Sequence, residues 1–274
     1  GDSMQLAHLQ VTSGGNRLSA SGRLANDSLV AEWDITAGEL ALLLPEATGV
    51  VAASGRVDGT LGAPRVQATA NASQLVMGGI ALSSLRASLR GGLAPDAPLA
   101  VDITAQGMAG DAQPLVQHLQ FTASGTTAAH RLGLEFSGAG ITLDSRLVGG
   151  LDQALAWRGE IEQGAVDGGA VAGRWSLAAP AAVSLAADGA ALAQTCLLTA
   201  EGRRGRVCAQ AAWSPPDGSR LALEWAGLQV AQWLPDVTAE VSGQGQITLT
   251  PDGSLNGGLE TTLGPGFARF DSSQ

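Results

Sequence analysis

The feature that most constrains the fold of this chain is a strict alternation of apolar and polar residues that recurs along the whole sequence. From Leu99 to Gln106 every odd position is apolar, and positions 102, 104 and 106 are polar. The ten residues from Val241 to Thr250 follow the same rule, with glycine counted as non-polar. Because successive side chains of a strand point to opposite faces of a sheet, this pattern predicts strands with one apolar and one polar face. Further runs of this kind begin at Leu29, Val51, Leu119, Leu132, Ile141, Leu155, Val183 and Leu221.

Clusters of turn-forming residues separate these runs. Turns are expected at Asn26-Asp27, Gly62–Pro64, Pro95-Asp96, Gly149-Gly150 and Pro251–Gly253. The 38 glycines of the chain have no three-residue period, which excludes collagen and favours a chain that turns often. The sequence therefore predicts an all-β protein. We expect an elongated, curved and open sheet, U-shaped or solenoid-like, with an apolar inner groove and a few short helices.

A helical period appears in only two places, and their matching contexts indicate an internal repeat. It extends over Ala37–Leu44 and Leu228–Leu234, and each segment ends at a proline, which cannot continue a helix. Each segment follows a Glu-Trp pair, at positions 32–33 and 224–225, and precedes a glycine-rich alternating run. The predicted repeat is a strand, a short helix, a proline, a strand, a turn and a second strand.

No shift in composition marks a domain boundary. Residues 4–274 are therefore predicted to form one continuous, repeat-built β region, and residues 1–3 are interpreted as an expression scar. The region is interpreted as an internal fragment of a longer protein. No apolar run approaches the roughly 20 residues that a membrane-spanning helix requires, so any membrane anchor is expected outside the fragment.

Charge and the absence of known motifs limit the possible functions. The net charge is −10, which argues against nucleic-acid binding, because phosphate contacts require clustered positive charge. The three histidines, His8, His118 and His130, lie in no nucleophile, P-loop or dinucleotide-binding motif. Carboxylates such as Asp144 and Glu160 fall on the polar positions of strands, where solvation explains them. We expect no catalytic site, no cofactor and no metal ion.

The cysteine pair supplies a clue to the cellular compartment. Cys196 and Cys208 are the only cysteines, and the midpoint between them is Gly202, in a stretch that resembles a hairpin turn. In a regular hairpin centred there they would stand opposite each other on one face, where a disulfide is sterically possible. A disulfide would indicate an oxidising compartment such as the periplasm. The alternative is a pair of small buried thiols. Two cysteines without neighbouring histidine or acidic ligands do not complete a zinc site.

The apolar face is the candidate working surface. Apolar residues make up 45% of the chain but aromatic residues only 4%, and no long amphipathic helix is available to cover the face. Trp157, Trp175 and Trp225 lie on the apolar phase, where they either pack as core or line a surface for an apolar ligand. The residues predicted to line the groove and contact acyl chains are Val51, Val57, Leu99, Val101, Ile103, Phe121, Leu132, Leu134, Phe136, Ile141, Leu143, Leu147, Leu155, Trp157, Ile161, Trp175, Leu177, Val183, Leu185, Leu223, Trp225, Val241, Ile247 and Leu249.

Two groups of segments give the chain a resemblance to a known family. The order of the segments around the cysteines resembles that of the TamB family, the inner-membrane subunits of the translocation and assembly module. These segments are Thr195–Leu198, Gly205–Trp213, Leu221–Trp225 and Trp233–Pro235. Earlier segments resemble the repeats of the same family, in which strands and short glycine turns alternate. They are Gly55–Thr60, Pro64–Val66 and Gly78–Leu82.

This resemblance implies a function and a location. The chain would be a periplasmic segment of an envelope-spanning protein of a Gram-negative bacterium, anchored in the inner membrane. It would conduct phospholipid between the inner and outer membranes and support the assembly of outer-membrane proteins and autotransporters. The implied protein partner is a TamA-like outer-membrane protein of the Omp85 superfamily. Contact with that partner and with the membranes is expected through regions outside the fragment.

Two other functions stay open at this point. One is a chaperone-like scaffold whose sheet pairs with nascent outer-membrane strands. The other is a structural or adhesive β-solenoid whose strands close around a packed core. The cysteine pair and the repeated Glu-Trp units favour the TamB-like function.

Overall fold

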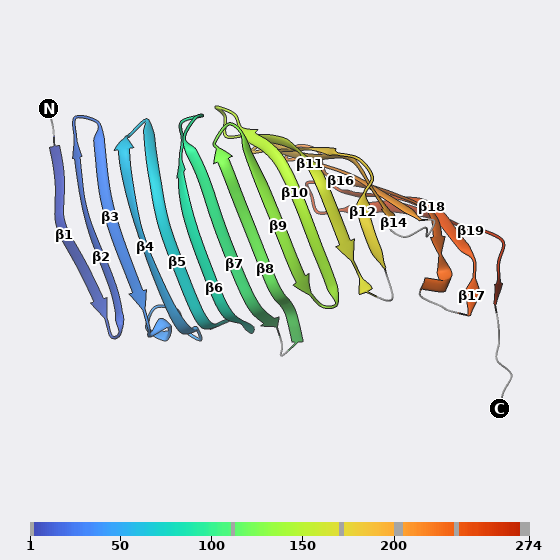
Figure 1. The fold of residues 1–274 in the computed structure, drawn as a ribbon, viewed down its shortest axis with the longest axis horizontal. Helices are drawn as coiled ribbons and strands as arrows, with labels where there is room; N and C mark the ends of the chain where they lie inside the picture. Colours follow the sequence, from blue (N-terminus) through green and yellow to red (C-terminus); the bar gives the residue numbers. More distant parts are fainter. Residues whose placement is uncertain (1–2, 111–112, 170–172, 200–204, 233–235, 269–274) are drawn as a thin grey trace. The chain divides into compact units, whose positions relative to one another are not determined.

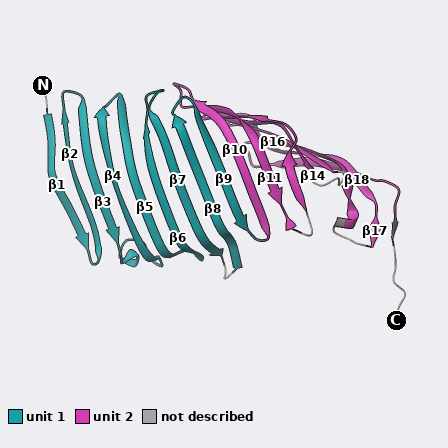
Figure 2. Ribbon diagram, viewed as in Figure 1, with its two compact units in different colours: residues 1–139 teal, residues 140–274 magenta. Residues whose placement is uncertain are grey.

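The protein is built almost entirely of β-strands. The computed structural model describes residues 3–110, 113–169, 173–199, 205–232 and 236–268. Within these residues there are twenty strands, of which eighteen belong to one antiparallel sheet (Figure 1). The chain divides into two compact units, residues 1–139 and 140–274, shown in different colours in Figure 2. The predicted all-β class is confirmed, and each unit is described separately below.

In unit 1 each strand pairs antiparallel with the next one along the chain. A short 3-10 helix, η1 (Leu40–Leu42), interrupts the connection between β3 and β4. The strands of unit 1 are β1 (Ser3–Ser13), β2 (Asn16–Ala25), β3 (Ser28–Ala37), β4 (Thr48–Thr60), β5 (Ala63–Met77), β6 (Ile80–Gly92), β7 (Pro98–Gly110), β8 (Gln113–Thr126) and β9 (His130–Gly138).

Unit 2 follows the same antiparallel order with one local exception. The short strands β12 and β13 each pair with both β11 and β14. The strands of the main sheet in unit 2 are β10 (Ile141–Leu151), β11 (Trp157–Asp167), β12 (Arg174–Leu177), β13 (Ala181–Ala186), β14 (Gly189–Thr199), β15 (Arg206–Ser214), β16 (Gly218–Gln229), β18 (Glu240–Leu249) and β19 (Leu255–Leu263). A 3-10 helix, η2 (Val230–Gln232), follows β16, and β17 (Val237–Thr238) pairs with β20 (Phe267–Ala268).

The register of the strands aligns the alternating side chains into rows that cross the sheet. Because directly opposed residues of neighbouring strands project from the same face, a row of paired residues lies on one face. One such row crosses all nine strands of unit 1 and contains no charged side chain. It comprises Leu9, Ala20, Trp33, Gly55, Ala68, Leu89, Val101, Ala123 and Leu132.

Little of the protein is buried, because neither unit folds a second layer over its sheet in the described residues. The protein exposes 17041 Å², whereas a compact monomer of 27.5 kDa would expose about 11,000 Å². Most of the buried apolar residues are alanines, and Cys208 is the largest fully buried side chain among the described residues. The fold is therefore held mainly by backbone hydrogen bonds between strands and by side-chain contacts within one face.

Both predicted short helices are present as shorter 3-10 turns. In unit 1, Leu40 of η1 packs with Ala37 and Ala47 against β4 and β5. The buried Asn16 fixes this turn, since its Nδ2 donates to the carbonyl of Glu39 at 2.8 Å and its Oδ1 accepts from the Glu39 N–H at 3.0 Å. Three residues are helical here rather than the predicted eight. In unit 2 the predicted segment begins inside β16, continues through η2 and ends outside the described residues.

One predicted turn and one predicted strand start need correction. Gly149 and Gly150 lie inside β10 rather than in a turn, because β10 continues to Leu151 and the indole of Trp157 covers Gly149. The strand predicted to start at Leu155 starts at Trp157 instead. Leu155 occupies a left-handed turn with φ +59°. The predicted turn at Asn26-Asp27 is confirmed, and both residues have positive φ, as a two-residue type I′ hairpin requires.

The predicted repeat has a structural basis in a contact between tryptophan and glycine. Trp33 of β3 lies over Gly55 of β4, and Trp225 of β16 lies over Gly243 of β18. In each case the tryptophan follows a glutamate and the glycine belongs to the next strand of the sheet. Since a Cβ at either glycine would collide with the indole ring, the pair requires glycine at that position.

We expect the substitution Gly55→Ala to destabilise the protein by about 1–3 kcal/mol, the usual cost of forcing extra atoms into a filled site. Gly62→Ala is the matched control, because a Cβ at Gly62 meets nothing within 4 Å. Urea unfolding curves of the two variants measure the difference. Equal unfolding midpoints for both variants would show that Trp33 does not depend on Gly55.

Candidate functional site

The candidate site is the face of the sheet that carries the apolar rows, called the apolar face below. Two of its rows run side by side across unit 2. The first row consists of Val183, Leu192, Ala211, Leu221 and Ile247. The second row consists of Leu185, Ala190, Trp213, Ser219 and Leu249. Both rows line a hollow of about 410 Å³, called the unit 2 hollow below. Its floor is the backbone of the residues between the two rows.

The apolar side chains around this hollow are open to solvent. Leu185 is 52% exposed, and Trp213, Ile247 and Leu249 are 42–43% exposed. Side chains of this size are usually buried in a folded protein. An exposed, continuous apolar surface is typical of a site that receives an apolar ligand or partner.

All the residues predicted to line the groove in unit 1 lie on its apolar face. They are Val51, Val57, Leu99, Val101, Ile103, Phe121, Leu132, Leu134 and Phe136. The alternation of apolar and polar residues alone was sufficient to predict which face these side chains share, because each strand keeps its phase through the predicted residues. Their contact with acyl chains stays a prediction.

In unit 2 the predicted residues share the apolar face with one exception. Leu155 lies in the turn before β11 and belongs to no row. Ile141 begins β10 in phase with Leu143. The residues aligned by the register are Leu143, Leu147, Trp157, Ile161, Trp175, Leu177, Val183, Leu185, Leu223, Trp225, Val241, Ile247 and Leu249.

Several residues of the apolar face were not predicted from the sequence. Leu192, Ala211 and Trp213 line the unit 2 hollow but stand in alanine-rich strands where the alternation is weak. Trp33 and Leu9 belong to the apolar row of unit 1. The Glu-Trp repeat would have identified Trp33, since its counterpart Trp225 was already placed on the apolar face. Leu9 follows a register shift in β1 between Leu6 and Leu9, which breaks the period.

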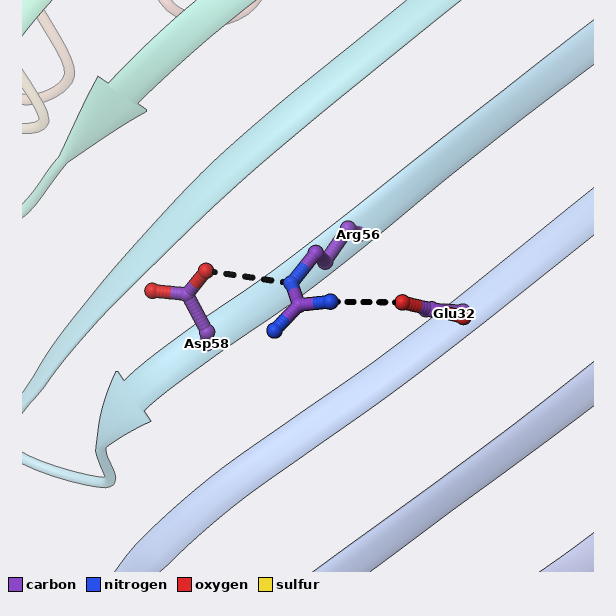
Figure 3. Close-up of polar contacts among 3 residues, drawn as sticks. All are labelled: Glu32, Arg56 and Asp58. Carbon is purple, nitrogen blue, oxygen red and sulfur yellow. Dashed lines mark hydrogen bonds and ion pairs between the residues drawn. The ribbon is translucent and has the colours of Figure 1, made fainter.

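The opposite face is polar and carries its own hollows. The larger one, of about 730 Å³ in unit 1, is lined by serine, threonine and charged side chains that include Glu32, Arg56 and Asp34. Arg56 pairs through Nη1 with Glu32 at 2.6 Å and through Nε with Asp58 at 3.3 Å (Figure 3). Unit 2 repeats this arrangement with an ion pair between Arg206 and Glu224. These exposed pairs contribute little to stability, and the face they occupy suits water rather than an apolar ligand.

The cysteines form a disulfide that joins β14 to β15. Cys196 and Cys208 are directly opposed residues of the antiparallel pair, as the hairpin interpretation predicted. Their neighbours Leu197 and Val207 are paired on the apolar face, so the disulfide lies on the polar face. The predicted turn, Gly202–Gly205, lies outside the described residues except for Gly205.

The three histidines lie in different strands, His8 in β1, His118 in β8 and His130 in β9. His8 Nε2 lies 3.4 Å from Gln10 Oε1, and the buried His130 donates through Nδ1 to the Thr126 carbonyl at 3.0 Å. His118 is half-buried on the polar face opposite Gln106 and Ser137. In the part of the chain that the structure describes, no three His, Cys, Asp or Glu side chains gather as metal ligands would. No described helix has the length and apolar character needed to cross a membrane.

Comparison with known families gives a match that covers nearly the whole chain. The family model described as TamB, N-terminal domain, matches residues 2–260. Comparison with curated protein sequences gives no match.

We expect loss of the disulfide to lower the free energy of unfolding by about 3 kcal/mol, because the bond closes a short loop in the unfolded chain. The variant is Cys196→Ser with Cys208→Ala, which places the smaller apolar side chain at the buried position. The control is the wild-type protein unfolded with and without reductant. An unchanged urea midpoint in both comparisons would contradict a stabilising role for this bond.

Proposed function

The chain belongs to the TamB family, and from this premise we propose that its apolar face carries phospholipid acyl chains between the inner and outer membranes. The family serves assembly and lipid transport in general, and the proposal assigns the lipid-conducting part to this surface. In the same proposal, lipid supply by the chain supports the assembly of outer-membrane proteins and autotransporters.

The observation that carries the proposal is the continuity of the apolar rows. Within each unit the rows pass from strand to strand, and no second layer covers them in the described residues. An apolar face left in water is unfavourable, because its surface gains none of the free energy that burial would release. A lipid chain would cover it.

The physics of acyl-chain binding suits transport. Each 100 Å² of apolar surface removed from water would stabilise the bound lipid by about 2.5 kcal/mol. This stabilisation is non-directional, so a chain can move from one row to the next without losing a specific hydrogen bond. Small residues of the rows, such as Ala211, leave space between larger neighbours. No single residue would then act as a catalytic group, and the proposal includes no enzymatic step.

The polar face and the disulfide fit a location in the periplasm of a Gram-negative bacterium. The disulfide between Cys196 and Cys208 would persist in that oxidising compartment, and the charged face would remain in water. The proposed protein partner is a TamA-like protein of the Omp85 superfamily. Contact with that partner, and with the membranes, would be made by regions outside this chain.

The two alternative functions differ in their support. A closed solenoid is disfavoured, because the strands of each unit form antiparallel neighbours rather than stacked coils around a packed core. A scaffold that pairs with nascent strands stays an alternative, and the identity of a cross-linked molecule distinguishes it from lipid transport.

We expect a photo-reactive amino acid on the apolar face to capture phospholipid in the cell envelope. Val101 and Ile247 are the test positions, and their neighbours Asp102 and Gln246 on the polar face are the controls. Mass analysis of the adducts should give lipid at the first pair and not at the second. Equal lipid labelling on both faces would contradict the proposal, and capture of outer-membrane polypeptide alone would favour the strand scaffold.

A charge placed in the unit 2 hollow should expel the lipid, because an unpaired carboxylate is costly to cover with an acyl chain. The variant is Ala211→Asp, and Ala212→Asp is the matched control. Ala212 lies one residue along the same strand; its backbone belongs to the floor of the hollow, but its exposed side chain projects from the opposite, polar face. Chromatography of extracted lipid should show less phospholipid per protein for Ala211→Asp than for Ala212→Asp. The same lipid content in both would count against a role for this hollow.

A further inference from the structure

We propose that the unit 2 hollow seats an acyl chain of a phospholipid whose head group carries an ammonium, and that it disfavours anionic phospholipids. This inference rests on the proposed lipid-carrying function and adds selection by head-group charge. Two features carry it. One is the apolar hollow itself, and the other is the charge of the sheet edge beside it.

The hollow lies at the end of the strands. Its second row contains Leu185, Ser219 and Leu249, and each of these residues is within three positions of a hairpin turn. The turns join β13 to β14, β15 to β16 and β18 to β19. Because alternate hairpins of an antiparallel meander lie at the same edge of the sheet, these three turns are neighbours along one edge.

Each of the three turns contains an aspartate followed by glycine. The residues are Asp188, Asp217 and Asp252, and we call this part of the sheet the aspartate edge. Asp-Gly is a favoured hairpin dipeptide, but Asn-Gly serves the same backbone geometry. The turn geometry therefore accounts for a short polar residue at each position and does not require three negative charges.

Two carboxylates of the aspartate edge accept hydrogen bonds from residues of their own turns. Asp252 accepts hydrogen bonds from the Thr250 hydroxyl and, at 3.0 Å, from the Ser254 N–H, and these bonds lower the pKa of its carboxyl. Asp217 accepts from the Ser214 hydroxyl at 2.9 Å. Neither carboxylate forms an ion pair with an arginine among the described residues.

Two arginines lie near the hollow, but neither forms an ion pair with a carboxylate of the aspartate edge among the described residues. Arg158 pairs with Asp152 of the turn before β11, at 2.9 Å. Arg220 is among the residues that line the hollow, but it pairs across the sheet with Ala212 and Thr248, so its side chain projects from the polar face. The head group of a lipid at the aspartate edge would therefore meet net negative charge.

Trp213 indicates where the acyl chain meets the head group. It belongs to the row nearest the turns, lines the hollow and is 43% exposed. Tryptophan favours such boundaries, because its ring is apolar and its indole N–H is polar. A volume of about 410 Å³ is within the range of roughly 300–1,000 Å³ that is typical of small-molecule sites. One acyl chain placed along the two rows would leave its head group beside the aspartate edge.

The charge of the edge then favours one class of phospholipid. The phosphate of any phospholipid is repelled there, but an ammonium in the same head group offsets the repulsion. Interactions between exposed charges of the edge and the head group would change the binding equilibrium by about twofold to tenfold in total. High salt screens such charges, since the Debye length falls to about 3 Å at 1 M. The expected preference is therefore modest and dependent on salt.

A competition experiment on the intact chain tests the inference. Delipidated protein is mixed with equal amounts of phosphatidylethanolamine and phosphatidylglycerol of identical acyl chains in a neutral detergent, and the bound lipids are measured by native mass spectrometry. We expect the phosphatidylethanolamine to bind in about threefold excess or more. The variant Asp188→Asn, Asp217→Asn, Asp252→Asn should abolish this excess, as should 1 M salt during loading. The intact mass of the variant verifies that its amides have not hydrolysed.

The control is a second triple variant of unit 1, Asp27→Asn, Asp34→Asn, Asp96→Asn, which removes the same total charge from exposed residues. It should keep the preference of the wild-type chain. Equal binding of both lipids by the wild type, or equal loss of preference in both variants, would overturn the inference. If neither lipid binds at all, the proposed function itself fails, and that outcome is distinct from binding without selection.

Discussion

The structure depends on the register between antiparallel strands. Each unit is a single layer of sheet, so no packed core corrects a misplaced strand, and one residue of slip would move a whole set of apolar side chains to the polar face. The observed pairs keep every charged residue out of the row that extends from Leu9 to Leu132. Register shifts do occur, as between Arg146 and Leu147, and there the apolar phase of β11 shifts as well. The apolar face is thus a product of pairing rather than of burial.

Contacts between tryptophan rings and glycines of the neighbouring strand add to the stability that strand pairing provides. A sheet with few aromatic residues gains local stability where a ring covers a neighbouring glycine, as Trp33 covers Gly55 and Trp225 covers Gly243. Each pair is accompanied on the opposite face by an ion pair to the glutamate before the tryptophan, formed by Arg56 in one unit and Arg206 in the other. The repeat therefore specifies both faces at once: a covered glycine on the apolar side and a charge pair on the polar side.

The sequence predicted the faces better than it predicted the boundaries. Alternation is local, so it placed Val101, Ile247 and their neighbours on the apolar face correctly. Turn composition was less reliable: Gly149 and Gly150 look like a turn but lie within β10, because Trp157 supplies the bulk that the glycines lack. The unit 2 hollow could not be predicted, since it arises from residues of five strands whose alignment depends on register. Alanine-rich strands such as β14 and β15 give almost no periodic signal, although the cysteine pair within them aligned those two strands.

The central claim is that the apolar face is a surface for lipid rather than an incompletely covered core. Its most direct test is the native mass spectrum of the unmodified chain, purified from an envelope extract without added lipid. The account predicts masses increased by one or more phospholipids, which are lost on collisional activation. A spectrum with only the mass of the bare polypeptide, under conditions that preserve the lipid adducts of a known carrier, would contradict it.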